Sequence, residues 1–294
     1  MTSTAPRYLY AYAVVRASGA VAGALDTVSG VAGGRVRALH HRDLMVLAGP
    51  VPAADHGEEQ LAANLEDLDW LERTARAHQR VISAAADVAP GVLPLRLATV
   101  FHDEAGVRAM VDARHEQLRA ALDRLDGCTE WGVKVYALGT APPAETATAP
   151  RGNGPHENTP RAATSGRDYL RLRAAERRAA QEGARHEDEV ARGIHSALTA
   201  LARENRLHPP QNPRLSGRTG RNVLNAAYLV GREDGSRFTS AVARLAERAP
   251  DDGMRVDLTG PWAPYSFAGA AGTAGTDAAG TAGADGAGIT AEVP

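Results

Sequence analysis

Residues 222–258, NVLNAAYLVGREDGSRFTSAVARLAERAPDDGMRVDL, contain both of the periodicities from which a mixed fold is built. The segment Asn222–Val230 is rich in apolar residues and predicts a strand. Asp234-Gly235 predicts a turn, and Ser236 is placed to cap the helix that follows. Met254–Leu258 predicts a second strand. This alternation of strand and helix within one short segment indicates an α+β protein.

The residues before this segment extend the same pattern. Thr129–Leu138, TEWGVKVYAL, predicts a strand, and Ser165 with Asp168 resembles a capping box that opens a long helix. Arg206–Ser216 is rich in proline, which favours a strand at the edge of a sheet. The resulting order of strand, helix, edge strand, strand, helix and strand is the βαββαβ order of ferredoxin-like domains.

The first half of the chain predicts a modified version of this domain. Its three opening strands precede the first long helix, and a loop rich in Gly and Ala separates the first two strands at Ala17–Gly34. The remaining expected elements are strands at Tyr8–Val15, Arg35–His41, Leu44–Val51 and Val92–Phe101 and helices at 55–87 and 103–126.

These patterns define the expected domain organisation. We predict an α+β chain of two ferredoxin-like domains with long helices, the first over residues 1–127 and the second over residues 128–267. Residues 140–164 repeat Pro, Thr, Asn and Gly without apolar periodicity, which predicts a flexible insertion. Residues 268–294 are rich in Gly, Ala and Thr. They have too little apolar surface to offset the entropy of ordering, so we expect a disordered C-terminal tail.

The composition argues against a nucleic-acid or membrane partner. The formal net charge is -2 over 294 residues, whereas proteins that bind polyanions carry strongly basic surfaces. No segment approaches the ~20 apolar residues that span a bilayer. Residues 1–7 lack the apolar run of a signal peptide. We therefore expect a cytoplasmic protein, in which the one cysteine, Cys128, is a buried free thiol.

The common catalytic and cofactor motifs do not occur in the sequence. A phosphate-binding loop needs a lysine, and the one lysine, Lys134, falls inside a predicted strand. Neither a GxSxG elbow nor an HExxH pair is found. We therefore expect no catalytic residue, no metal and no cofactor.

Two other classes of function remain open at this point. His78 lies on the apolar face of the first long helix, either as a hydrogen-bonded core histidine or as a general base. With Arg96 it is the candidate pair for a small-molecule enzyme of the oxygenase type. Tyr8, Tyr10 and Tyr12 share one face of a strand, either to stack RNA bases or to pack beneath helices. We favour the core histidine and the packed tyrosines.

Four segments, taken together, resemble one protein family. Gly260–Phe267, GPWAPYSF, is similar to the closing motif of the GvpF/GvpL family of gas vesicle proteins, with alanine in place of one proline. Leu9–Val15, LYAYAVV, resembles the opening strand of that family. Leu93–Phe101, LPLRLATVF, and Asn225–Asp234, NAAYLVGRED, resemble two of its internal segments and occur in the expected order. The resemblance covers about residues 8–267.

The resemblance implies a gas vesicle assembly factor or minor structural protein. Members of the family bind the hydrophobic shell protein GvpA and limit its aggregation during vesicle nucleation. The resemblance therefore implies GvpA as a partner, together with other gas vesicle accessory proteins. It also implies the gas vesicle as a location beside the cytoplasm.

Candidate partner-binding residues come from three places in the chain. They are the aromatic side chains of the closing motif, an arginine inside a predicted strand, and a cluster of arginines at the start of the long helix. A solvated helix face is the alternative for the cluster. The aromatic side chains could instead lock the chain end onto the core, which we favour. The candidates are Trp262, Tyr265, Phe267, Arg96, Arg171 and Arg178.

Overall fold

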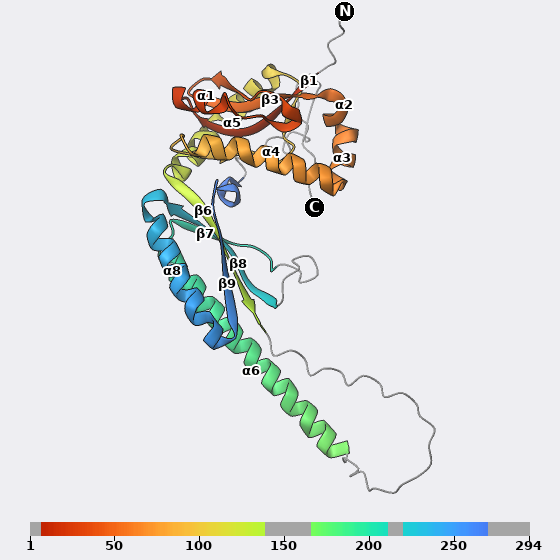
Figure 1. Cartoon of the computed structure of the whole chain (residues 1–294), viewed down its shortest axis with the longest axis vertical. Coiled ribbons are helices and arrows are strands. Elements are labelled where there is room, and N and C mark those ends of the chain that lie inside the picture. Colours follow the sequence, from red (N-terminus) through yellow and green to blue (C-terminus); the bar gives the residue numbers. More distant parts are fainter. Residues whose placement is uncertain (1–6, 139–165, 211–219, 270–294) are drawn as a thin grey trace, which may run out of the picture.

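The computed structural model describes residues 7–138, 166–210 and 220–269, in which the strands form two antiparallel sheets flanked by helices (Figure 1). The predicted insertion at 140–164 lies outside the described residues. Residues 270–294 of the predicted tail also lie outside them. Ala268, where we expected the tail to begin, is buried against the protein.

The first sheet has the strand order β2-β3-β1-β4, and β5 also pairs with β1. Helix α1 leads from β1 to β2, and helix α4 leads from β3 to β4. The first unit therefore follows the complete βαββαβ order. Its elements are β1 (Arg7–Arg16), α1 (Gly19–Leu25), β2 (Arg37–His41), β3 (Leu44–Pro52), α2 (Ala53–His56), α3 (Glu58–Glu66), α4 (Leu68–Ala86), β4 (Val92–Pro94) and β5 (Val100–Phe101).

The second sheet has the order β7-β8-β6-β9. Counted along the chain within each unit, β1 to β4 and β6 to β9, both sheets have the spatial order second, third, first, fourth strand. The predicted α+β fold with ferredoxin-like units is confirmed. The elements of this unit are β6 (Cys128–Ala137), α6 (Gly166–Thr199), β7 (Glu204–Leu207), β8 (Arg221–Gly231), α8 (Gly235–Arg248) and β9 (Met254–Trp262).

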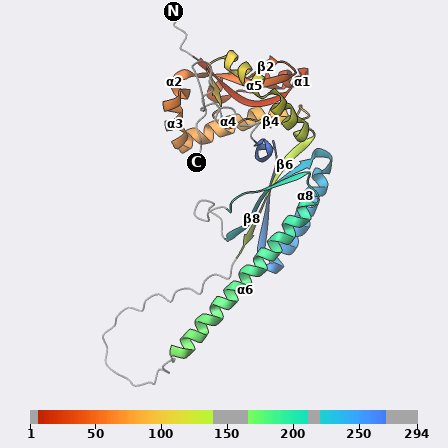
Figure 2. The ribbon, with the colours of Figure 1, turned by 180° about the vertical axis from the view of Figure 1, so that it is seen from behind.

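Helix α5 (Glu104–Leu125) connects the two units and packs in the second of three cores. The first core lies between the first sheet and helices α1, α3 and α4. The second core lies on the opposite face of that sheet, where α5 packs together with Ala227 and Leu229 of β8. The third core lies between the second sheet and helices α6 and α8, and α6 extends well beyond the strands (Figures 1 and 2).

A β-bulge in β1 distributes its side chains between the first two cores. The pairing of β1 with β3 shifts between Ala11 and Ala13, so that Tyr12 is an extra residue. Tyr10 and Tyr12 therefore share the first core with Val15, and both tyrosines are fully buried. The expectation that these side chains pack beneath helices is confirmed for both, because neither presents a free face to a base.

Two predicted elements of the first unit are wrong in detail. The loop at Ala17–Gly34 contains α1, which Ser18 caps by accepting a hydrogen bond from the Ala20 amide. The single helix at 55–87 is three helices, because the backbone is extended at Gly57 and at Asp67. Leu68, at the start of α4, is 78% exposed.

The predicted strand at Val92–Phe101 is interrupted, and the predicted cap at Ser236 is absent. Between β4 and β5 the chain turns at Ala98, whose φ is 63° and whose amide donates to the Tyr10 hydroxyl. This side-chain acceptor replaces a ladder hydrogen bond. Helix α8 begins at Gly235, directly after a 3-10 turn at Arg232–Asp234, and no side chain caps it.

Within the described ranges, no helix has both the length and the apolar character needed to cross a bilayer. The same residues contain no group of three or more His, Cys, Asp or Glu side chains placed to hold a metal ion.

Candidate functional site

The closing segment Gly260–Phe267 passes between the two units and reaches the first and the second core. It leaves the second sheet at Trp262, the last residue of β9, and ends in a 3-10 turn at Tyr265–Phe267. Ala263 is buried in the first core, and Phe267, at 2% exposure, is buried in the second. The segment therefore makes apolar contacts with the first core in its middle and with the second core at its end.

A buried carboxylate of β6 holds the end of this segment. Glu130 accepts hydrogen bonds from the Ser266 amide at 2.8 Å and from the Ser266 hydroxyl at 2.6 Å. Burial raises the pKa of the Glu130 carboxyl, and the hydrogen bonds from Ser266 oppose that effect. A carboxylate bound by two donors at once fixes the direction of the chain at Ser266.

The histidine next to this serine does not make a nucleophilic triad. His208 Nε2 lies 3.1 Å from the Ser266 hydroxyl oxygen. Because the hydroxyl proton points to Glu130, the imidazole can only donate to the serine oxygen. In a Ser-His-Asp triad the imidazole lies between the serine and the acid and accepts the hydroxyl proton. The hydrogen bonds from His208 to Ser266 and from Ser266 to Glu130 therefore anchor the chain.

Two further hydrogen bonds tie the segment to the first unit and to α5. The Tyr265 hydroxyl donates to the side-chain oxygen of Gln79 in α4 at 2.7 Å. The Arg124 guanidinium of α5 donates to the carbonyl oxygen of Phe267. The closing segment is thus bound to α4, α5 and β6 together.

Gly260 begins the segment in a conformation that other residues rarely adopt. Its φ is 121°, and the Gly260–Pro261 peptide is cis. A Cβ atom at this position would lie 2.9 Å from the Glu130 carbonyl oxygen and 3.1 Å from the ring of Trp131. The backbone therefore needs glycine here for its dihedral angle and for its close approach to β6.

Replacing this glycine should destabilise the protein. We expect Gly260→Ala to lower the free energy of unfolding by about 2 kcal/mol, because strain in this φ region adds to a backbone clash. Gly235→Ala is the matched control, since nothing lies within 4 Å of a Cβ there and its backbone is already helical. Chemical denaturation measures both variants. Equal stability of the two would contradict the strained geometry at Gly260.

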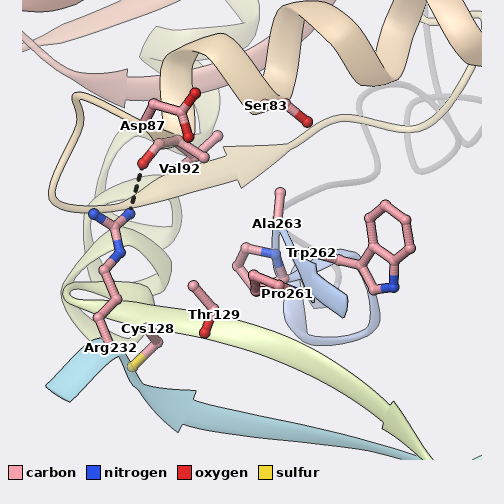
Figure 3. Close-up of a pocket in the computed structure, with 11 residues that line it drawn as sticks. Ser83, Asp87, Val92, Cys128, Thr129, Arg232, Pro261, Trp262 and Ala263 are labelled. Carbon is pink, nitrogen blue, oxygen red and sulfur yellow. Dashed lines mark hydrogen bonds between the residues drawn. The ribbon is translucent and has the colours of Figure 1, made fainter. Parts of the chain in front are cut away.

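A cleft of about 290 Å³ opens beside the closing segment (Figure 3). In Figure 3, Ser83 of α4 and Asp87, which follows that helix, lie on one side of the segment, and Cys128 and Thr129 of β6 lie on the other. Trp262 lies at the edge of the cleft and is 45% exposed. The cleft is lined by Ser83, Ala86, Asp87, Val92, Cys128, Thr129, Arg232, Pro261, Trp262, Ala263 and Pro264.

Arg232 and Cys128 contribute differently to this cleft. The Arg232 guanidinium donates to the carbonyl oxygens of Ala86 and Ala89, at 2.9 and 3.0 Å, where α4 ends. Its charge therefore lies at the negative end of the helix dipole and links the second unit to the first. Cys128 is a buried free thiol, as expected, and burial raises its pKa. A raised pKa keeps the sulfur protonated and unreactive.

The predicted partner-binding residues do not form one surface. Trp262 and Tyr265 are partly exposed in the closing segment, at 45% and 36%, whereas Phe267 is buried. Phe267 therefore does not form part of a surface, because its ring fills the second core. Arg96 is exposed in the turn between β4 and β5, not inside a strand. The arginines Arg171 and Arg178 are exposed on the projecting part of α6.

His78 is a buried core residue in a cluster of aromatic rings. It is 3% exposed, and its Nδ1 lies 3.2 Å from the Tyr10 hydroxyl. Burial lowers the pKa of His78 to about 4, partly offset by the Leu95 carbonyl. The cleft beside Trp262 is not lined by His78 or Arg96, and neither is a second cavity between α4 and residues 29–33. Neither of these two cavities brings the pair together.

Sequence reasoning did not identify the anchor at Glu130 or the bond from Arg232 to α4. The signal for Glu130 was available, since a carboxylate among the apolar residues of Thr129–Leu138 needs hydrogen-bond donors if it is buried. Arg232 gave no such signal, because it follows β8 in a turn where a solvated arginine is ordinary.

Comparisons with known proteins agree with this architecture. The family model for gas vesicle synthesis protein GvpL/GvpF matches residues 8–269. Gas vesicle protein L of Streptomyces sp. (strain CB03234) is 46% identical over 266 residues, which cover 90% of this chain and 94% of that protein. Gas vesicle protein F of the same strain is 30% identical over 203 residues, covering 69% of this chain and 80% of the relative.

Two crystal structures of gas vesicle protein GvpF have the same fold. The protein from Anabaena sp. PCC7120 superposes with a TM-score of 0.61 at 20% identity, over 89% of this chain and 96% of that one. The protein from Microcystis aeruginosa gives a TM-score of 0.60 at 18% identity, over 89% and 98% of the two chains. The family match over nearly all of the described residues, together with the close L-type relative, shows that this chain belongs to the GvpL/GvpF family of gas vesicle synthesis proteins.

Proposed function

We propose that this chain binds the gas vesicle shell protein GvpA and limits its aggregation while a vesicle is nucleated. The observation that carries the proposal is Trp262, an exposed aromatic side chain at the edge of a cleft within the family's closing segment. Binding takes place in the cytoplasm and at the growing vesicle, with other accessory gas vesicle proteins as further partners. Reversible contact of this kind requires no catalytic group.

The exposed ring of Trp262 suits contact with an apolar segment of a shell subunit. A subunit that keeps water out of a gas space carries a large apolar face, which must be covered before assembly. Tryptophan is the side chain most often found at the energetic centre of an interface, especially beside a pocket. Pro261 and Pro264 flank Trp262 closely and restrict the backbone, which lowers the entropy lost when a partner binds.

Co-expression with GvpA tests this proposal. We expect wild-type chain to keep GvpA in the soluble fraction and to co-purify with it. Trp262→Ala should bind GvpA about 30-fold more weakly, the effect of losing about 2 kcal/mol at an interface anchor. Leu138→Ala is a matched control, because Leu138 is 44% exposed but does not line the cleft.

Folding must be measured alongside binding to interpret the result. If Trp262→Ala retains its unfolding temperature and loses GvpA binding, the cleft is the contact surface. If GvpA aggregates equally with and without the wild-type chain, the proposed function is wrong. If both alanine variants bind GvpA as the wild type does, then GvpA docks elsewhere on the chain.

A further inference from the structure

The first ten described side chains of α6 form a basic arm with exposed apolar groups. This basic arm, Tyr169–Arg178, has four arginines and one glutamate, a formal charge of +3. Tyr169, Leu170 and Leu172 occupy a single helical turn and are 52%, 63% and 58% exposed. The arm lies on the part of α6 that projects beyond the second sheet (Figures 1 and 2).

The far end of the first unit has the opposite charge. This acidic end, Glu58–Glu72, covers α3 and the start of α4 and has six acidic residues and no basic one, a formal charge of -6. Leu68 lies in the middle of its acidic stretch and, at 78%, is the most exposed large apolar side chain among the described residues. Basic residues resume at Arg73, which limits the acidic end on α4.

Most of the acidic groups are not neutralised within the chain. Glu72 pairs with Arg76, and Asp67 caps α4 by accepting from the Asp69 and Trp70 amides. Across the part of the chain that the structure describes, Glu58, Glu59, Glu66 and Asp69 take part in no ion pair. These four carboxylates remain available to a cationic surface.

A solvated helix face would explain the charges but not the apolar groups between them. Exposed leucines are ordinary when they are scattered, yet here three large apolar side chains share one turn of the basic arm, and another lies within the acidic end. An apolar centre surrounded by complementary charge is the arrangement of a specific interface. The acidic end and the basic arm lie far apart in both views of the molecule, so the two surfaces of one chain do not meet (Figures 1 and 2).

We infer that the basic arm of one copy docks on the acidic end of a second copy, with Leu170 and Leu172 packing near Leu68. The contact is heterologous, because it joins two different surfaces. Each docked copy therefore keeps one free arm and one free acidic end, and copies can add in a row. The individual ion pairs are exposed and weak, so orientation and salt dependence come from charge, and the apolar centre excludes water.

Sedimentation velocity of the full-length chain tests this inference without GvpA. At about 0.1 M salt and up to about 0.1 mM protein, we expect concentration-dependent self-association. Raising the salt to about 1 M shortens the Debye length from about 10 to about 3 Å, and the association should weaken about tenfold or more. A wild-type chain that remains monomeric at the lower salt concentration overturns the inference.

Charge reversal identifies the two surfaces. Replacing Arg171, Arg177 and Arg178 by Glu changes the formal charge of the basic arm from +3 to -3 and should abolish association. Replacing Glu58, Glu59, Glu66 and Asp69 by Lys changes the acidic end from -6 to +2 and should also abolish it. A chain that carries both sets has complementary surfaces again, of -3 and +2, and should recover association within about tenfold of wild type. The matched control replaces Arg237, Arg244 and Arg248 of α8 by Glu, which is the same charge change as in the basic arm and should have no effect.

The chain that carries both sets of substitutions distinguishes this contact from other modes of self-association. Contact between two basic arms, or through an unrelated surface, predicts no recovery in that chain, and this outcome would refute the inference. Circular dichroism shows whether each variant is folded, and all of the substituted side chains are exposed. The GvpA assay is independent, since neither surface includes the cleft beside Trp262.

Discussion

Replacing Phe267 by alanine is expected to lower the free energy of unfolding by about 3–5 kcal/mol, the usual cost of removing a buried aromatic ring. The ring is 2% exposed and packs in the core that contains the free face of the first sheet, α5 and two residues of β8. A cavity at this position removes apolar contacts from the core that the two units share. The chain around it cannot collapse easily, because Ser266 and the Phe267 carbonyl are held by hydrogen bonds.

Trp262→Ala is the matched control for this prediction, because the same short segment carries both rings. Trp262 is 45% exposed, so its removal should change the free energy of unfolding by no more than about 1 kcal/mol. Urea denaturation, followed by circular dichroism, measures both variants. Equal destabilisation by the two substitutions would contradict the prediction, because it would mean that Phe267 is no more important to the core than the exposed Trp262.

The sequence could not separate these two side chains. Both are aromatic residues of one motif with flanking prolines, and either could have been the anchor or the contact residue. Their difference arises from the 3-10 turn at Tyr265–Phe267, which directs Phe267 into the core while Trp262 stays at the end of β9. That turn depends on Glu130, which is more than a hundred residues away in the sequence. Local patterns do not contain such a pairing.

The second unit was predicted well because its elements are long and strongly periodic. The first unit was predicted less well, and α1 shows why. Its sequence, GAVAGAL, has two glycines and one full turn of apolar residues, which is a weak helix signal. The helix forms because Val21 and Leu25 are buried against α4 and β2 and because Ser18 caps it. Tertiary packing therefore supplies what local propensity lacks.

The interrupted strand at Val92–Phe101 has a similar cause. Its residues are suited to a strand over their whole length, but its register with β1 changes between Pro94 and Val100, beside the bulge at Tyr12. The chain compensates by turning at Ala98, and the Tyr10 hydroxyl accepts the amide that is freed. A hydroxyl 88 positions away in sequence thus determines where β4 ends and β5 begins.

Acid should destabilise the protein through His78. The Tyr10 hydroxyl accepts from the Ala98 amide and lies 3.2 Å from Nδ1 of His78, to which it can donate when the imidazole is neutral. Burial lowers the pKa of His78 to about 4, from 6.5 in an unfolded chain. Between these two pH values the unfolded chain binds a proton that the folded chain does not. The contribution of His78 to stability is therefore complete above pH 6.5 and decreases as the pH falls toward 4.

The size of this loss follows from the difference between the two pKa values. The fall in the pKa of His78 from 6.5 to about 4 corresponds to a loss of about 3 kcal/mol of unfolding free energy between pH 7 and pH 4. His56, whose pKa is also lowered by burial, changes stability in the same direction. Glu130 acts in the opposite direction, because its raised pKa lets the folded chain take up a proton first as the pH falls.

A substitution at His78 separates its contribution from those of the other groups. His78→Asn retains a hydrogen-bond acceptor for Tyr10 but does not titrate, so we expect lower stability at pH 7 and a shallower loss toward pH 4. His40→Asn, at an exposed position on β2, is the control and should keep the wild-type slope. Urea denaturation at several pH values gives the two slopes. If both variants lose stability in parallel with the wild type, His78 is not the group that makes the core acid-sensitive. The aromatic cluster around it would then have to tolerate a charge that its burial argues against.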